Sequence, residues 1–102
     1  MLGTALKTIR NVKAFTKLNE PAAPVVGSKI PGPNSLALLN ELETTSSDYR
    51  TVRFFSDLDN SVGNYIADAD GNLLLDLDTQ MGTLPIGYNH PSLLSEIRKN
   101  NF

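Results

Sequence analysis

The 102-residue sequence has no cysteine, no tryptophan and only one histidine. The absence of cysteine excludes a disulfide scaffold and any zinc site built from thiolates. No apolar run approaches the ~20 residues that a membrane-spanning helix needs, so no membrane partner is expected. The formal net charge of -2 gives no broad basic surface, so no nucleic-acid partner is expected either. These absences favour a soluble intracellular chain.

The single histidine, His90, is a weak candidate for chemistry. A metal site with one histidine needs carboxylate ligands at a defined geometry, and no spacing in the sequence indicates them. The glycines are isolated and form no phosphate-binding loop. Because Asn89-His90-Pro91 precedes a predicted helix, a capping and turn role is favoured for His90. The sequence therefore predicts no metal site and no catalytic residue in this chain.

Four aspartates gather in the second half of the chain: Asp68, Asp70, Asp76 and Asp78. A calcium loop of EF-hand type requires glycine at its sixth position and oxygen ligands at its first and twelfth. When Gly71 takes the glycine position, Ile66 and Leu77 fall on these two ligand positions, so the motif fails. The cluster is interpreted as turn chemistry and solvated strand ends.

The beginning of the chain is basic and amphipathic. Four basic residues precede the first acidic one, Glu20, and five apolar residues share one face of a helical wheel. The basic residues are Lys7, Arg10, Lys13 and Lys17, and the apolar ones are Leu2, Ala5, Leu6, Ile9 and Val12. Residues 1–28 are therefore interpreted as a mitochondrial transit peptide or disordered arm, with the mitochondrial matrix as the location. A frayed helix on a cytoplasmic protein is the alternative.

Residues 21–33 contain Pro21, Pro24, Pro31 and Pro33. Because proline lacks an amide donor and restricts the residue before it, this stretch predicts an extended linker or wrapping arm. A short helix is predicted next, with Asn34 or Ser35 as its cap, and the polar run 44–48 ends it. Its apolar face consists of Leu36, Leu39 and Leu42.

A β-hairpin is the clearest local pattern. Two apolar runs, 64–68 and 73–77, flank Asp70-Gly71, which supplies the positive φ angles that a tight primed turn requires. An additional short strand is predicted over Val52, Phe54 and Phe55. After the hairpin, Gly82, Pro85 and Gly87 are expected to break any regular element.

A last helix is predicted from about Pro91 to Lys99, since proline suits the first helical position and apolar residues recur along one face. The predicted elements are thus two short helices and one or two hairpins, which offer no closed core. Three consecutive leucines at 73–75 place apolar side chains on both faces of one strand and call for cover on both sides. The sequence favours an α+β accessory piece of something larger.

One long motif carries a family resemblance. Residues 63–76 read G-N-Y-I-A-D-A-D-G-N-L-L-L-D, and residues 87–91 read G-Y-N-H-P. This arrangement resembles the start of the class III pyridoxal-phosphate-dependent aminotransferases. Three further features resemble the 4-aminobutyrate branch of that class, and the match spans about residues 29–98. They are Ile30-Pro31-Gly32-Pro33, the pair Phe54-Phe55, and Thr79-Gln80 leading to Leu84-Pro85-Ile86-Gly87-Tyr88.

The resemblance implies that residues 29–102 are the N-terminal part of the small domain of a fold-type I transferase. It implies transamination between 4-aminobutyrate and 2-oxoglutarate by a homodimer that uses pyridoxal 5'-phosphate. The cofactor-binding domain and the Schiff-base lysine of the family lie downstream of this segment, so neither Lys29 nor Lys99 takes that role. The chain alone is predicted to be inactive.

The resemblance also implies two substrate-pocket residues, Gln80 and Met81. The family places an apolar side chain at the position of Met81 when the substrate lacks an α-carboxylate, and ordinary core packing is the alternative for this methionine. Asp78 departs from the family, which usually has an aromatic residue there. Two other functions stay open: an aminotransferase for ornithine or another ω-amino acid, and a truncated, non-catalytic chain that binds full-length subunits.

Overall fold

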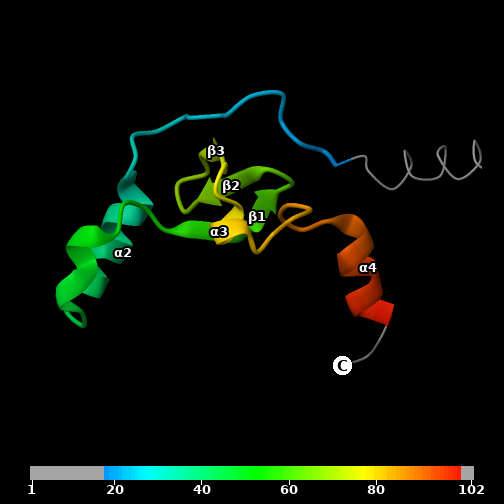
Figure 1. Ribbon diagram of the computed structural model, residues 1–102. Coiled ribbons are helices and arrows are strands. Elements are labelled where there is room, and N and C mark those ends of the chain that lie inside the picture. Colours follow the sequence, from blue (N-terminus) through cyan, green and yellow to red (C-terminus); the bar gives the residue numbers. More distant parts are fainter. Residues whose placement is uncertain (1–17, 100–102) are drawn as a thin grey trace, which may run out of the picture.

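The computed structural model describes residues 18–99 (Figure 1). The elements are α2 (Pro33–Glu43), the 3-10 helix η1 (Ser47–Thr51), β1 (Ser56–Val62), β2 (Tyr65–Asp68), β3 (Leu73–Leu75), α3 (Thr79–Gly82) and α4 (Pro91–Lys99). The three strands form one antiparallel sheet in the order β1-β2-β3. This arrangement confirms the α+β class. The basic residues of the predicted transit peptide lie outside the described residues.

The hairpin is confirmed, but its turn differs from the predicted one. β2 and β3 pair from Tyr65↔Leu75 to Ala67↔Leu73, and Asp68 N donates to Asn72 O over 3.0 Å. Three residues therefore form the loop, and within it only Gly71 has positive φ, at 82°. This corresponds to the longer hairpin class with one left-handed glycine rather than to a two-residue primed turn.

The additional strand was predicted too early in the chain. Residues 52–55 have no regular structure, and the strand that pairs with β2 is β1, in the polar run Ser56–Val62. Its register shifts between Asp57 and Val62. Within this irregularity the Ser61 hydroxyl donates to Asp57 O (2.7 Å) and accepts from Ala67 N (2.9 Å). A side chain thus replaces part of the backbone ladder, which explains why β1 lacks a clear alternating pattern.

The proline-containing arm is extended, as predicted, and it runs along the edge of β3. Val25 and Leu73 form an antiparallel bridge, with N···O distances of 2.9 and 2.8 Å. The buried amide of Asn72 holds the arm in place, because its Oδ1 accepts from Gly27 N (2.9 Å) and Ser28 N (3.0 Å). Its Nδ2 donates to Ser28 Oγ (2.9 Å) and to Asp68 Oδ2 (2.7 Å). All the polar positions of this side chain are used.

The aspartates of the hairpin serve turn chemistry, as predicted, but Asp68 is not solvated. It is 1% exposed and accepts hydrogen bonds from Asp70 N (3.0 Å) and Asn72 N (2.8 Å). The burial is tolerated because the carboxylate has these donors as well as the Asn72 amide. The interpretation of solvated strand ends was therefore wrong for Asp68.

The N-cap of helix α2 lies two residues before Asn34, the first of its two predicted caps. Gly32 is the N-cap, Pro33 is the first helical residue, and no local side chain caps the helix. The Asp70 carboxylate takes that role from the hairpin turn, accepting from Asn34 N (2.7 Å) and Ser35 N (3.1 Å). Partial desolvation raises the pKa of Asp70, but the hydrogen bonds from the helix N-terminus outweigh it and lower the pKa overall.

Helix α4 has the predicted bounds, Pro91–Lys99. The predicted capping role of His90 is confirmed, because its Nδ1 accepts from Ser92 N over 3.3 Å and its carbonyl accepts from Leu94 N over 3.1 Å. No residue of α4 is buried.

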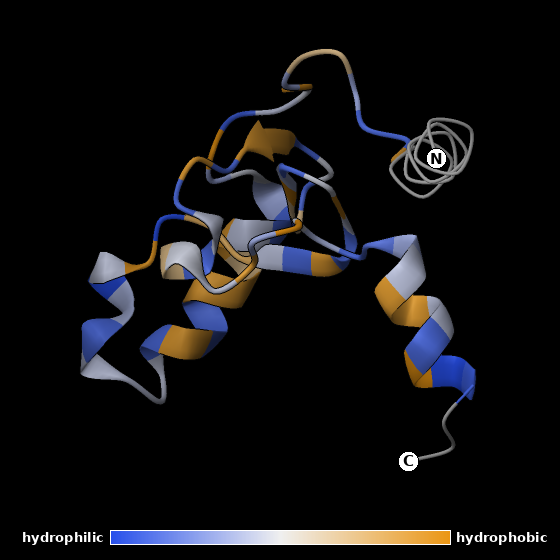
Figure 2. Ribbon diagram, turned by 45° about the vertical axis from the view of Figure 1, so that its right-hand side comes forward, coloured by the Kyte–Doolittle hydropathy of each residue, from blue (hydrophilic) through white to orange (hydrophobic). Residues whose placement is uncertain are grey.

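The buried hydrophobic residues of the described part are only Tyr65, Ala67 and Tyr88. Figure 2 shows apolar residues on α2 and α4, which extend away from the small sheet on opposite sides (Figures 1 and 2). Leu36 and Ile97, for example, are 49% and 59% exposed. In the part of the chain that the structure describes, no helix has the length and apolar character to cross a membrane. The described residues bury too few apolar side chains to make a core of their own.

Candidate functional site

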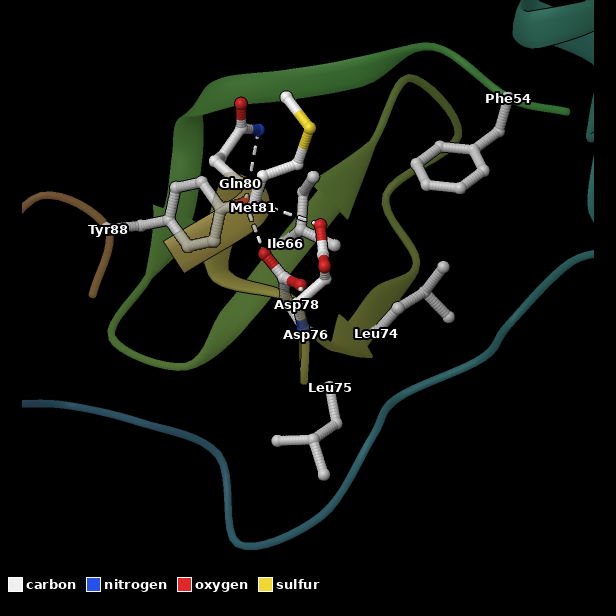
Figure 3. A pocket seen from close by; sticks show the side chains of 9 residues that line it. All are labelled: Phe54, Ile66, Leu74, Leu75, Asp76, Asp78, Gln80, Met81 and Tyr88. Atoms are coloured by element: carbon white, nitrogen blue, oxygen red, sulfur yellow. Dashed lines mark hydrogen bonds between the residues drawn. The ribbon is translucent and has the colours of Figure 1, made fainter. Parts of the chain in front are cut away.

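An open hollow of about 460 Å³ lies beside the hairpin (Figure 3). Apolar side chains of β2, of β3 and of the loop before β1 form one part of it. Polar side chains of the segment after β3 form the other part. The lining residues are Phe54, Ile66, Leu74, Leu75, Asp76, Asp78, Gln80, Met81 and Tyr88. An apolar wall with a few convergent polar groups is the usual composition of a small-molecule site.

The polar part of the hollow is built on a left-handed turn, α3. Thr79, Gln80, Met81 and Gly82 have φ angles of 49°, 55°, 58° and 73°. Gly82 is the last residue of this turn, and no helix or strand follows it before α4, as predicted. Three consecutive non-glycine residues in this region cost about 1–2 kcal/mol each, so surrounding contacts must hold them.

Two aspartates hold the turn. Asp76 Oδ1 accepts hydrogen bonds from Asp78 N and Thr79 N, both at 2.9 Å. Asp78 Oδ2 accepts from Met81 N at 2.9 Å, and its carbonyl accepts from Gly82 N at 2.8 Å. The carboxylates thus bind backbone amides that a left-handed turn would otherwise leave without partners.

Tyr88 connects this turn to the sheet. Its hydroxyl donates to Asp76 Oδ2 over 2.6 Å and accepts from Gln80 Nε2 over 3.3 Å (Figure 3). Its backbone forms a two-bond bridge with Gly63, at 2.7 and 2.9 Å. The approach is so close that a Cβ at the adjacent Gly87 would overlap the Gly63 carbonyl. Tyr88 is 5% exposed, so the ring and the hydroxyl are fixed by their surroundings.

The protonation states of this pair follow from the same contacts. The hydrogen bond from the Tyr88 hydroxyl, helped by backbone amides, lowers the pKa of Asp76 despite partial desolvation. Burial, and then the hydrogen bond to Asp76, raises the pKa of Tyr88 above 10.0. At neutral pH the site therefore holds a carboxylate that accepts and a phenol that donates.

The two residues assigned to a substrate pocket, Gln80 and Met81, both line the hollow (Figure 3). Met81 is 86% exposed, so it packs into no core formed by the described residues themselves. Gln80 is held through its amide on Tyr88. Their contact with a substrate stays a prediction.

Sequence reasoning gave no site role to Asp76 or Tyr88. Both stand in the motif that carries the family resemblance, but their contact spans 12 residues and involves a turn that local patterns do not indicate. The signal available in the sequence was an aspartate directly after the second apolar run of the hairpin, with a tyrosine beside a glycine further along the chain.

The hollow does not fit the phosphate of pyridoxal 5'-phosphate. The charged side chains that line it are the carboxylates Asp76 and Asp78, which repel an anion. Neither Lys29 nor Lys99 lines it, and Lys99 pairs with Glu96 over 2.8 Å on the exposed surface of α4. Among the described residues there is also no cluster of three potential metal ligands.

The chain is similar to curated proteins from organisms that are only distantly related to one another. It is 40% identical to the 4-aminobutyrate aminotransferase of Dictyostelium discoideum over 89% of its own length and 20% of the relative's. It is 47% identical to the 4-aminobutyrate aminotransferase of Emericella nidulans over 74% of its length and 15% of the relative's. The chain is also 41% identical to the mitochondrial 4-aminobutyrate aminotransferase of Homo sapiens, over 74% of its own length and 15% of the relative's.

These matches cover most of this chain but little of the relatives. The chain spans about a fifth, or less, of the length of the curated proteins that it matches. No family model matches the sequence.

Proposed function

We propose that this chain is one segment of a 4-aminobutyrate aminotransferase and that the segment forms part of the substrate-binding side of that enzyme. The observation that carries the proposal is the 40–47% identity to proteins of this one name over most of the chain. The reaction is transfer of the amino group of 4-aminobutyrate to 2-oxoglutarate. Residues 29–102 belong to the small domain of a class III, fold-type I transferase, and residues 1–28 precede it as a transit peptide or arm.

The cofactor belongs to the remainder of the enzyme. Pyridoxal 5'-phosphate supplies the electron sink for such reactions, and the hollow in this segment offers no cation for its phosphate. The complete enzyme is a homodimer in the mitochondrial matrix, a location supported by the name of the human relative. By itself, the 102-residue chain binds no pyridoxal phosphate and transfers no amino group.

Within the complete enzyme, Gln80 and Met81 form one wall of the substrate pocket. Support comes from their position at the hollow and from the 86% exposure of Met81, which leaves its side chain available for contact. An apolar side chain at this position suits a substrate without an α-carboxylate, because a buried carboxylate without a partner costs free energy. Ornithine and other ω-amino acids are the alternative substrates, because Asp78, which lines the hollow, stands where the family usually has an aromatic residue.

The test is a hybrid enzyme. In it, residues 18–99 of this chain replace the matching segment of the Dictyostelium 4-aminobutyrate aminotransferase, and a second hybrid uses the Emericella enzyme. We expect both to hold the cofactor and to transfer the amino group of 4-aminobutyrate to 2-oxoglutarate. The control replaces the same segment with a glycine-serine linker of equal length. Hybrids that hold the cofactor but transfer no amino group from any ω-amino acid would overturn the proposal.

A second candidate function is binding to full-length subunits without catalysis. The observation in its favour is the exposed apolar surface of α2 and α4, including Leu36, Leu93 and Ile97. A co-purification experiment with tagged 102-residue chain and the full-length Dictyostelium enzyme tests it. Recovery of a stable complex supports this function, whereas recovery of free chain alone contradicts it.

A further inference from the structure

We propose that Asp76 and Tyr88 are positioning residues that hold the left-handed turn α3, and thereby set the place of Gln80 and Met81 in the substrate pocket. This inference rests on the proposed function, since it assigns the pocket its supporting residues. Neither residue needs to touch the substrate. They act through the backbone and the side-chain amide of the residues that do.

The turn needs external support. Thr79, Gln80 and Met81 all have left-handed backbone angles, and none is a glycine, so the unrestrained chain would leave this conformation. None of the three is asparagine, aspartate or histidine, the non-glycine residues that visit the region most readily. Side chains that project from such a turn keep their direction only while other contacts determine it.

Asp76 provides this support at the start of the turn. One carboxylate oxygen binds the amides of Asp78 and Thr79, and the other binds the Tyr88 hydroxyl. Because the carboxylate is charged and its partners are fixed, these bonds are stronger than bonds between neutral groups. Asp76 also directly follows the hairpin, and its own N donates to Asn64 O over 2.8 Å, so the carboxylate is placed by the sheet.

Tyr88 provides the second point of support. Its backbone bridge to Gly63 fixes it to the corner between β1 and β2, and the next residue, Asn89, donates to Ser61 O over 2.8 Å. From this fixed place the hydroxyl meets both Asp76 and the Gln80 amide. Gln80 is therefore located by a contact to the sheet, and Met81 follows as its neighbour in the turn (Figure 3).

The experiment compares four variants of the hybrid enzymes: Asp76→Ala, Asp76→Asn, Tyr88→Phe and, as a control outside the hollow, Asp59→Ala in β1. The readouts are KM and kcat for 4-aminobutyrate, the ratio of kcat/KM for 4-aminobutyrate to that for ornithine, and the absorbance of the bound cofactor. A purely structural role would lower the yield of enzyme but would leave the substrate ratio of the folded fraction unchanged.

For Asp76→Ala we expect kcat/KM for 4-aminobutyrate to fall about 10- to 100-fold, mainly through KM, with a smaller ratio over ornithine and an unchanged cofactor spectrum. Asp76→Asn keeps an acceptor for both amides, so it should stay within about threefold of the parent. The kcat/KM of Tyr88→Phe should lie between the values of these two variants, and the kcat/KM of Asp59→Ala should equal that of the parent hybrid.

Two results would overturn the inference and are distinct from failure of the proposed function. The first is an active parent hybrid whose Asp76→Ala variant keeps the KM and the substrate ratio. The second is an Asp76→Asn variant as impaired as Asp76→Ala, because a contact of the charge itself, rather than placement of the turn, would then explain the loss. Parent hybrids that are inactive contradict the proposed function instead.

Discussion

Asp70, in the turn between β2 and β3, caps a helix that begins 37 positions before it in the chain: its Oδ1 accepts from Asn34 N over 2.7 Å. The same turn also holds the proline-containing arm through Asn72 and the buried carboxylate of Asp68. One short hairpin loop therefore fixes both the arm and the first helix relative to the sheet. The polar residues of this loop are structural, and none of Asp68, Asp70 and Asn72 lines the hollow.

The cap gives a first prediction. Asp70→Ala should speed hydrogen exchange at the first amides of α2, because Asn34 N and Ser35 N lose their acceptor. Hydrogen-exchange mass spectrometry on peptides covering residues 33–43 of the hybrid enzyme measures it. Asp70→Asn, which keeps an acceptor, is the control and should lose less protection. Equal exchange in all three proteins would contradict the cap.

Asn72, at the β2–β3 turn, should be the residue on which the position of the arm depends most. In Asn72→Ala, the amides of Gly27 and Ser28 and the buried Asp68 oxygen all lose their partner, at a cost of about 1–3 kcal/mol in local stability. Exchange in residues 25–28 and 65–75 should accelerate by about 5- to 150-fold. The matched control is Asn60→Ala, an exposed site on β1, where less than about 0.5 kcal/mol is expected.

Alanine substitutions at two glycines distinguish the cost of backbone strain from the cost of steric overlap. Gly71 and Gly87 have nearly equal φ angles, 82° and 81°, but a Cβ meets nothing within 4 Å at Gly71 and overlaps the Gly63 carbonyl at Gly87. Gly71→Ala should cost about 1–2 kcal/mol for the left-handed backbone alone. Gly87→Ala should cost about 1–3 kcal/mol more and should weaken the Gly63–Tyr88 bridge. Exchange at Gly63 N and Tyr88 N reports the difference, and equal effects would contradict the close approach.

Met81 should control substrate choice with little effect on folding. Because its side chain is 86% exposed, Met81→Tyr should change local stability by less than about 0.5 kcal/mol. A phenol hydroxyl can donate a hydrogen bond to an α-carboxylate, so the kcat/KM ratio of 4-aminobutyrate to ornithine should fall about tenfold in the hybrid enzyme. Met81→Leu is the control and should keep the ratio. An unchanged ratio in Met81→Tyr would remove Met81 from the pocket wall.

The Asp76–Tyr88 pair predicts a two-sided pH dependence. The pKa of Asp76 is lowered, so its contribution to stability is present above the ordinary value of 3.8 and is lost as pH falls through the lower folded-state pKa. The pKa of Tyr88 is raised, so its contribution is present below 10.0 and is lost as pH rises through the higher folded-state pKa. Tyr88→Phe should remove the alkaline loss at α3, measured by the exchange of Thr79 and Met81 amides. Asp76→Asn should reduce the acid loss without abolishing it, because the pKa values of Asp57 and Asp70 are lowered too.

Several elements could be predicted because they depend on neighbours in sequence. Pro91 and the residues after it specify α4, and His90 supplies its cap. The prolines keep the arm extended, and the apolar runs around Gly71 make the hairpin. The family motif likewise singles out Gln80 and Met81, and both line the hollow.

The strand β1 could not be placed in the same way. Its sequence is polar and shows no alternation of apolar and polar residues. In the structure the Ser61 hydroxyl, rather than a regular backbone ladder, joins the strand to Ala67. Phe54 and Phe55 favour β-structure, but they lie outside the strand. The residues that pair with β2 begin at Ser56, one position after Phe55. Tertiary pairing therefore outweighed local propensity here.

The sequence by itself determined the arm, the hairpin, α2 and α4, because proline geometry, glycine in a turn and helical spacing act within a few residues. Only the tertiary structure decided how these parts contact one another and how Gln80 and Met81 are oriented at the hollow. The Asp70 cap, the Asn72 clamp and the Asp76–Tyr88 bond connect residues 36, 45 and 12 positions apart. Such contacts have no local signature, since each depends on the chain having already brought a charged or polar group to a backbone that lacks a partner.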